Sequence, residues 1–200
     1  IQSAINACPA DQVVFMPAGT YKITNTIHLR SRVTLRGAGS TTKLKWMGSA
    51  NFILEIRDSA YEDGVFYNTS PYNLSGGYTK GSTSVTMANN NWAVGDVILI
   101  DQQSDGNLVV AGGTSGPATW CGRDNGDRCM GQLVKVLTRS ATSITFEPPL
   151  YTDYAANLVP QGIKVKGVTE YAGYEDFAVD NVNNARDTMW WFGGYRCWLK

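Results

Sequence analysis

The sequence has 200 residues, of which 43% are hydrophobic and 17% charged, a charged fraction below the roughly 25% typical of soluble domains. Lysine plus arginine and aspartate plus glutamate both number 17, so no net charge favours nucleic acid or an anionic membrane surface as a partner. No hydrophobic run approaches the roughly 18 residues that a membrane span needs. The composition therefore indicates a globular, strand-rich chain and argues against nucleic-acid and membrane partners.

The first residues predict a short amphipathic helix. Ile1, Ala4, Ile5 and Cys8 recur with helical spacing, and Pro9 ends the pattern. The chain begins inside this pattern without a methionine, and its last residues come directly after an alternating strand pattern. We therefore expect it to be a processed or truncated piece of a longer protein.

Short strand patterns follow the helix, and glycine, serine, asparagine or proline separates them. They are Val13–Met16, Thr26–Leu29, Val33–Arg36, Lys43–Trp46 and Phe52–Ile56. In VVFMPAGTYKI, the proline cannot donate to a sheet ladder and the glycine permits a backbone bend that other residues avoid. This corner is typical of a chain that keeps turning in one sense, and less so of a hairpin.

A longer interval is also visible in the strand patterns. Val13–Val14, Val33–Leu35 and Ile53–Ile56 lie about 20 residues apart, and so do Phe177–Val179 and Cys197–Leu199. Such a period indicates a stacked architecture in which each segment pairs in parallel with the same segment of the previous turn. We expect these segments to lie above one another.

The stretch IQSAINACPADQVVFMPAGTYKITNTIHLRSRVTLRGAG resembles the opening of right-handed parallel β-helix proteins of the pectate-lyase-like superfamily. The resemblance lies in the capping helix, the PAGTY corner and the VTLRGAG strand, and it covers about 40 residues. EDFAVDN and YRCWLK resemble later coils more weakly. The resemblance implies an all-β, right-handed parallel β-helix with a short N-terminal capping helix. It does not fix an activity, because the superfamily includes lyases, hydrolases, epimerases and non-catalytic tailspikes.

Between these two parts the long interval disappears. GSTSVTM, VGDVILI, GQLVKVL and SITFEPPL are alternating strand patterns, and VGDVILI and GQLVKV are expected to pair as antiparallel barrel strands. We therefore predict an inserted small antiparallel β subdomain at 64–160. The cap and first coils then occupy 1–63, and further coils, truncated at the end of the chain, occupy 161–200.

The four cysteines are compatible with an oxidising compartment. Cys121 and Cys129 bracket CGRDNGDRC and would close it as a disulfide, whereas the pairing of Cys8 and Cys197 stays open. A zinc site is disfavoured, because paired CxxC motifs are absent and His28 is the only histidine. Together with the resemblance, this usage suggests a secreted protein, either extracellular or periplasmic.

Alternation along the last strands predicts which charged residues face solvent. If Phe177 and Val179 point inward, Asp176 and Asp180 point outward, and their oxygens could hold Ca²⁺ as a possible cofactor.

On the next turn, about 4.8 Å away, Arg196, Trp198 and Lys200 would point outward in the same way. Arg196 could clamp a carboxylate, and Arg196 or Lys200 could act as a base if its pKa were lowered.

This patch suits cleavage of an acidic polysaccharide. β-Elimination needs a neutralised substrate carboxylate and a base, and the same aspartates could begin the acid–base cluster of a hydrolase. The plain alternative is a set of surface ion pairs worth about 0–1 kcal/mol each. The candidate catalytic residues are Asp176, Asp180, Arg196 and Lys200.

The aromatic run TMWWFGGYRCW supplies candidate sugar-binding residues, namely Trp191, Tyr195 and Trp198. Alternation implies that about half of its aromatic side chains pack inside instead.

These observations predict a secreted enzyme that degrades an acidic polysaccharide, either a lyase acting by β-elimination or a glycoside hydrolase. The alternative is a non-catalytic carbohydrate-binding or tailspike-like adhesin β-helix. The expected partner is the polysaccharide. The polymer, the oligomeric state and whether the active site lies within these residues remain open.

Overall fold

Nearly all regular structure in the computed structural model is β-strand. The model describes residues 1–56, 70–106, 123 and 127–200. The chain divides into two compact units, one formed by Ile1–Phe66 with Gly167–Lys200 and the other by Tyr67–Lys166.

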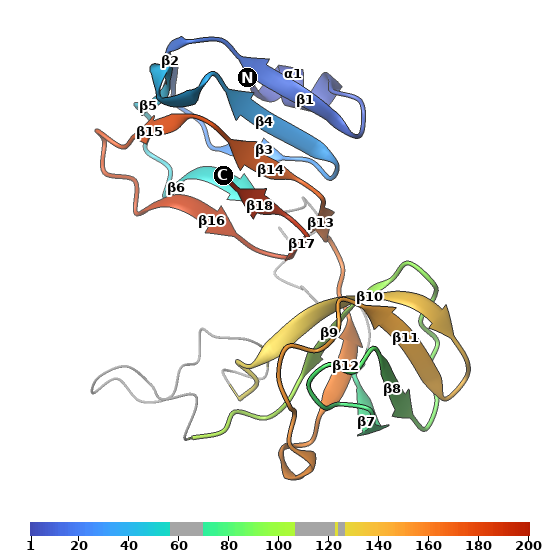
Figure 1. Ribbon diagram of the computed structural model, residues 1–200. Helices are drawn as coiled ribbons and strands as arrows, with labels where there is room; N and C mark the ends of the chain where they lie inside the picture. The colour runs from blue at the N-terminus through green and yellow to red at the C-terminus, as the bar shows by residue number, and fades with distance from the viewer. Residues whose placement is uncertain (57–69, 107–122, 124–126) are drawn as a thin grey trace. The chain divides into compact units, whose positions relative to one another are not determined.

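The first unit is built from successive turns of chain that each contribute one strand to three sheets (Figure 1). The first turn contains β1 (Gln12–Met16), β2 (Gly19–Ile23) and β3 (Ile27–Leu29), and the second contains β4 (Val33–Gly37), β5 (Thr42–Trp46) and β6 (Phe52–Ile56). Each second-turn strand pairs in parallel with its first-turn counterpart. A 3-10 turn, η1 (Gly39–Thr41), precedes β5.

The third turn continues the same three sheets after the inserted unit. It contains β14 (Gly173–Glu175), β15 (Ala178–Asp180) and β16 (Asp187–Trp191), preceded by β13 (Thr169–Glu170) and followed by β17 (Gly194–Tyr195) and β18 (Trp198–Leu199). The sheet orders are β1-β4-β14-β18, β2-β5-β15 and β3-β6-β16, with a further pair β13-β17, and all pairings are parallel. The stacked parallel turns expected from the sequence are therefore present.

Alternation along these strands fills the space inside the turns. Tyr21, Leu44 and Val179 share one register row and all pack in or against the apolar core. Tyr174 is fully buried, and its hydroxyl donates to the carbonyl oxygens of Ile27 (2.9 Å) and Glu55 (3.0 Å). This tyrosine therefore ties two sheets together from inside.

The expectation about which segments lie above one another needs two corrections. Val14 pairs with Leu35 as expected, but Ile53 lies on β6 in a different sheet. Likewise β18 pairs with β14 and not with β15, so Val179 has Leu44 as its neighbour. Both errors arise because the turns differ in length. Residues separated by a fixed number of positions then lie on strands of different sheets.

The opening helix, α1 (Gln2–Ala7), covers one end of the stack. The Gln2 side chain accepts a hydrogen bond from the backbone N–H of His28 (2.9 Å) and donates one to the His28 carbonyl oxygen (3.0 Å). The helix predicted from the apolar spacing is confirmed, and it satisfies edge groups that β3 would otherwise expose.

The second unit is a closed antiparallel barrel of six strands in the order β10-β11-β8-β7-β12-β9. The strands are β7 (Tyr72–Gly76), β8 (Ser84–Met87), β9 (Val97–Asp101), β10 (Gly131–Arg139), β11 (Ser143–Glu147) and β12 (Gln161–Lys164), and a 3-10 turn, η4 (Ala156–Leu158), precedes β12. The predicted pairing of VGDVILI with GQLVKV is confirmed, with Leu99 opposite Leu133. Closure leaves none of these six strands with a free edge.

A buried ion cluster stabilises one region of the barrel unit. Asp101 is fully buried at the end of β9 and accepts from Arg123 (2.6 and 2.9 Å) and from Arg128 (2.9 Å). Burial raises the pKa of the Asp101 carboxyl, and the hydrogen bond from Arg123 opposes that shift. The two arginines thereby compensate a carboxylate that would be costly to bury alone.

Candidate functional site

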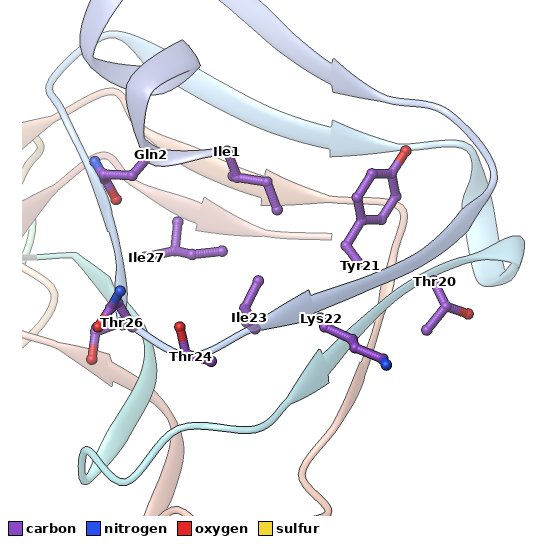
Figure 2. Close-up of a pocket in the computed structure, with 10 residues that line it drawn as sticks. Ile1, Gln2, Thr20, Tyr21, Lys22, Ile23, Thr24, Thr26 and Ile27 are labelled. Carbon is purple, nitrogen blue, oxygen red and sulfur yellow. The ribbon is translucent and has the colours of Figure 1, made fainter.

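An open hollow in the first unit lies beside α1 and β2 and has a volume of about 740 Å³ (Figure 2). Ile1, Ile23 and Ile27 contribute apolar side chains, while Thr20 and Lys22 lie on its β2 side. The residues that line it are Ile1, Gln2 and 20–27, none of which is Asp, Glu, His or Cys. This lining offers no acid–base pair, so we place the candidate site elsewhere.

The outward surface of sheet β1-β4-β14-β18 carries the better candidate. We call it the Trp198 face and define it by two rows of outward residues: Val13, Thr34, Gly173 and Trp198 in one, and Phe15, Arg36, Glu175 and the adjoining Lys200 in the other. Parallel pairing places neighbouring members of a row about 4.8 Å apart. The face therefore combines aromatic groups on its outer strands with charged groups between them.

Trp198 is held in one position on this face. A Cβ atom at Gly173 would lie 2.2 Å from Cε2 of Trp198, so the indole occupies the space directly over that glycine. The indole N–H donates to Oε1 of Glu175 at 2.7 Å. The ring is half-buried, so part of it stays available to a ligand.

Glu175 links Trp198 to the neighbouring strand. Its carboxylate is buried, and Nε of Arg36 donates to Oε2 at 2.5 Å. The hydrogen bond from Arg36 lowers the pKa of Glu175 below its usual range, and the indole hydrogen bond acts in the same direction. The carboxylate therefore remains ionised and acts as the anchor of the ring.

Asp176 and Lys200 come together beside this anchor, as the sequence suggested. Nζ of Lys200 lies 4.0 Å from Oδ2 of Asp176, and the Asp176 N–H donates to the Lys200 carbonyl oxygen at 3.1 Å. Asp176 occupies the corner after β14 with a φ of 55°. A positive φ in a residue other than glycine is costly and is often found at functional sites.

Asp180 and Arg196 do not join this pair in the way the sequence suggested. Asp180 ends β15 and lies in register with Lys45 on a different sheet. Arg196 occupies the corner between β17 and β18, and its guanidinium lies 5.8 Å from the ring centre of Tyr195. The predicted single patch is thus distributed over two sheets and a corner.

The other two aromatic candidates differ in accessibility. Tyr195 is 2% exposed and packs edge-on against Tyr171, so it belongs to the interior. Trp191 is 40% exposed, and its indole nitrogen occupies the space that a Cβ at Gly194 would need. Trp191 and Trp198 therefore both lie over glycines, but Trp198 is the one joined to a buried carboxylate.

Sequence reasoning missed Glu175 and Arg36. Glu175 precedes the predicted Asp176 and was overlooked because the neighbouring strand was placed opposite 177–179. The signal that could have found it is the pairing of GYE with WLK, which places Gly173 opposite Trp198 and Glu175 level with Lys200.

Several further predictions concern metals, cysteines and membranes. Within the described ranges, no group of three or more His, Cys, Asp or Glu side chains gathers to hold a metal ion, and the possible calcium site at Asp176 and Asp180 stays a prediction. Cys8 and Cys197 carry free thiols. Cys121 lies outside the described residues, so its predicted bond with Cys129 also stays a prediction. Across the described residues, no helix has the length and apolarity of a membrane span.

Comparisons with known proteins bear on the fold. The model of the family described as rhamnogalacturonase A/epimerase, pectate lyase-like, matches residues 1–94. No curated protein matches the chain.

Three solved phage structures are similar to the chain. The tailspike gp61 of Pseudomonas phage phi297 has 16% identity and a TM-score of 0.58, over 100% of this chain and 30% of that chain. The tailspike protein gp49 of Pseudomonas phage LKA1 has 19% identity and a TM-score of 0.48, over 86% and 26%. The Gp54 tailspike of Acinetobacter baumannii bacteriophage AP22, solved in complex with A. baumannii capsular saccharide, has 14% identity and a TM-score of 0.44, over 94% and 30%.

The chain thus spans less than a third of each of these solved proteins. At these identities the likeness concerns the fold alone, and only the phi297 comparison is close enough to support an argument. It agrees with the parallel turns of the first unit and with the family match at the N-terminal end. Residues 1–94 therefore match the pectate-lyase-like family model, and the fold of the chain is similar to that of part of the phi297 tailspike.

Proposed function

We propose that the protein binds a polysaccharide on the Trp198 face and takes part in cleaving that polymer. The observation that carries the proposal is the indole of Trp198, which is half-exposed and fixed over Gly173 by its hydrogen bond to Glu175. We further propose that the turns wind as a right-handed parallel β-helix and that the protein acts outside the cell.

A fixed indole suits a sugar ring for physical reasons. The apolar face of a pyranose packs on an aromatic surface, while charged and polar groups nearby bind its hydroxyls. Because Glu175 and Gly173 already hold the ring, little side-chain freedom is lost when the ligand binds. Phe15 is 56% exposed and lies three strands from Trp198 in the same sheet, about 14 Å across the strands. An extended polymer could therefore contact both rings.

Charged groups beside the ring support cleavage of an acidic polymer. Lys200 could neutralise a substrate carboxylate or act as the base of a β-elimination, and Asp176 lies beside it. Asp180 and Arg196 remain candidate catalytic residues. Calcium bound by Asp176 and Asp180 is part of the same proposal. Hydrolysis by paired carboxylates is the second chemical route. The description of the matched family, which names a rhamnogalacturonase and an epimerase, favours an enzyme.

A second candidate function is saccharide binding without cleavage, as in an adhesin of the tailspike type. The fold likeness to the phi297 tailspike, which extends over the whole chain, favours this candidate. Both candidates use the same face, so they differ in products and not in the binding residues.

The test measures binding to a panel of charged and uncharged polysaccharides by affinity electrophoresis. Trp198→Ala should abolish retardation, whereas the matched Trp191→Ala, which removes an equally large exposed ring, should keep it. If both variants bind as the wild type does, the Trp198 face is not the site.

Products then separate the chemical candidates. A lyase releases unsaturated ends that absorb in the ultraviolet, and a hydrolase releases reducing ends without that absorbance. Asp180→Asn and Arg196→Ala should leave the melting temperature nearly unchanged while abolishing turnover. Binding without either product, measured on the full-length protein, would assign the adhesin function.

A further inference from the structure

A lysine cluster lies on the outward surface of the second sheet of the first unit, β2-β5-β15. Lys22 of β2 stands directly opposite Lys45 of β5, and Lys43 lies two residues before Lys45 on the same side of that strand. Parallel pairing separates the backbones at Lys22 and Lys45 by about 4.8 Å, and the step from Lys43 to Lys45 is about 6.6 Å. We call these three residues the lysine ladder.

Nothing in the described part of the chain neutralises the ladder. None of the three lysines forms an ion pair with a described residue. Asp180 is the next residue in the row after Lys45, yet it forms no ion pair with it. Like charges opposite each other on neighbouring strands destabilise a sheet. A bound anion would remove that repulsion.

The surroundings of the ladder suit a sugar chain. Lys22 and Thr20, which stands opposite Lys43 in the register, both line the hollow beside α1 (Figure 2). Thr24 and Asn25 line the same hollow and supply a hydroxyl and an amide within the same stretch of chain. Anionic groups could therefore bind the ammonium groups while neighbouring sugar hydroxyls bind the hollow.

We propose that the lysine ladder binds the carboxylate or sulfate groups of an extended anionic polysaccharide, on a different sheet from the Trp198 face. The identification of the ligand as a polysaccharide rests on the proposed function, whereas the anion preference rests on the ladder alone. Duplex DNA is the disfavoured polyanion, because the sequence has equal numbers of acidic and basic residues and the ladder holds only three lysines.

The experiment measures the affinity of the wild-type protein and the double variant Lys22→Gln/Lys45→Gln for four polymers: polygalacturonate, dextran sulfate, uncharged dextran and duplex DNA. The double variant should bind the two anionic polysaccharides about tenfold more weakly, since two exposed ion pairs are lost. Lys22→Arg/Lys45→Arg keeps the charge and should bind as the wild type does. Lys80→Gln, which removes an exposed lysine of the barrel unit, should have no effect.

Salt provides a second readout, because exposed ion pairs are screened as ionic strength rises. Wild-type affinity for polygalacturonate should fall with added NaCl more steeply than that of the double variant. Equal affinities and equal salt dependence of the two proteins would contradict the proposed role of the lysine ladder. Binding of DNA as tight as that of the anionic polysaccharides would contradict it too.

Failure of the ladder and failure of the proposed function give different results. If Trp198→Ala abolishes binding but the double variant does not weaken it, the ladder is wrong and the Trp198 face stands. If the lysines matter and Trp198→Ala binds normally, the ladder stands and the Trp198 face is wrong. If the wild type binds no polysaccharide, both are wrong.

Discussion

The indole N–H of Trp198 donates to the carboxylate of Glu175 across two neighbouring parallel strands, at 2.7 Å. The same carboxylate accepts from Arg36 on the strand beyond. One buried acid thus joins three successive turns of the chain on their outer surface. The position of the ring is set by the register of the sheet and not by the aromatic residue alone.

Gly173→Ala should weaken saccharide binding about as much as Trp198→Ala does. The added methyl group would lie 2.2 Å from the indole and would displace the ring without removing it. Gly106→Ala is the matched control, because a Cβ there meets no atom of a described residue within 4 Å. Affinity electrophoresis checks the result. Full binding by Gly173→Ala would show that the position of the ring is unimportant.

The Glu175–Arg36 pair should contribute to stability at neutral pH and lose that contribution in acid. Arg36 lowers the pKa of Glu175 in the folded chain below its ordinary value of 4.5, so the unfolded chain takes up the proton first as pH falls. The contribution is complete above about pH 4.5 and disappears as pH falls through the lowered pKa. Glu175→Gln keeps a side-chain oxygen that can accept from the indole, but it has no carboxyl group to titrate.

Chemical denaturation at pH values from 7 down to 3 tests this expectation. The difference in unfolding free energy between wild type and Glu175→Gln should shrink steadily below about pH 4.5. A difference that stays constant with pH would mean that Arg36 does not stabilise the ionised carboxylate.

Leu35→Ala should destabilise the first unit by about 2–5 kcal/mol, because Leu35 is fully buried inside the stacked turns. Phe15→Ala is a useful comparison, since Phe15 lies on the paired strand but faces outward and is 56% exposed. It should change stability little. Thermal and denaturant unfolding measure both. Similar losses for the two variants would contradict the assignment of inner and outer rows.

Asp101→Asn should destabilise the barrel unit by about 3–5 kcal/mol, because Arg123 and Arg128 would lose their buried carboxylate partner. Asp11→Asn removes the partner of Arg32 at the surface and should have little effect. The unfolding of both variants can be followed by calorimetry. A small loss for Asp101→Asn would show that the cluster is not needed for folding.

Local sequence patterns were sufficient to predict strand pairing where the paired strands lie close together in the sequence or show clear alternation. The PAGTY corner predicted that β1 and β2 belong to one turn, and the pairing of Val14 with Leu35 followed from the first interval. The barrel strands β9 and β10 were likewise recognisable from alternation alone.

The site was less predictable because it depends on register between turns. An assumed equal turn length placed Trp198 beside 177–179, whereas its actual neighbour is Gly173. Tyr195, a candidate sugar-binding residue from the aromatic run, is buried. Turn lengths are set by corners, which tolerate insertion without changing the core, so hydrophobic spacing does not determine them.

The pairing of Arg36 with Glu175 also bears on the order of folding, because the whole barrel unit lies between these residues in the chain. Bringing together two segments so distant in sequence is slow when the intervening chain is a random coil. A barrel that acquires its structure first would remove most of that coil's freedom. Assembly of the unit at the middle of the chain should thus precede and accelerate completion of the stack around it.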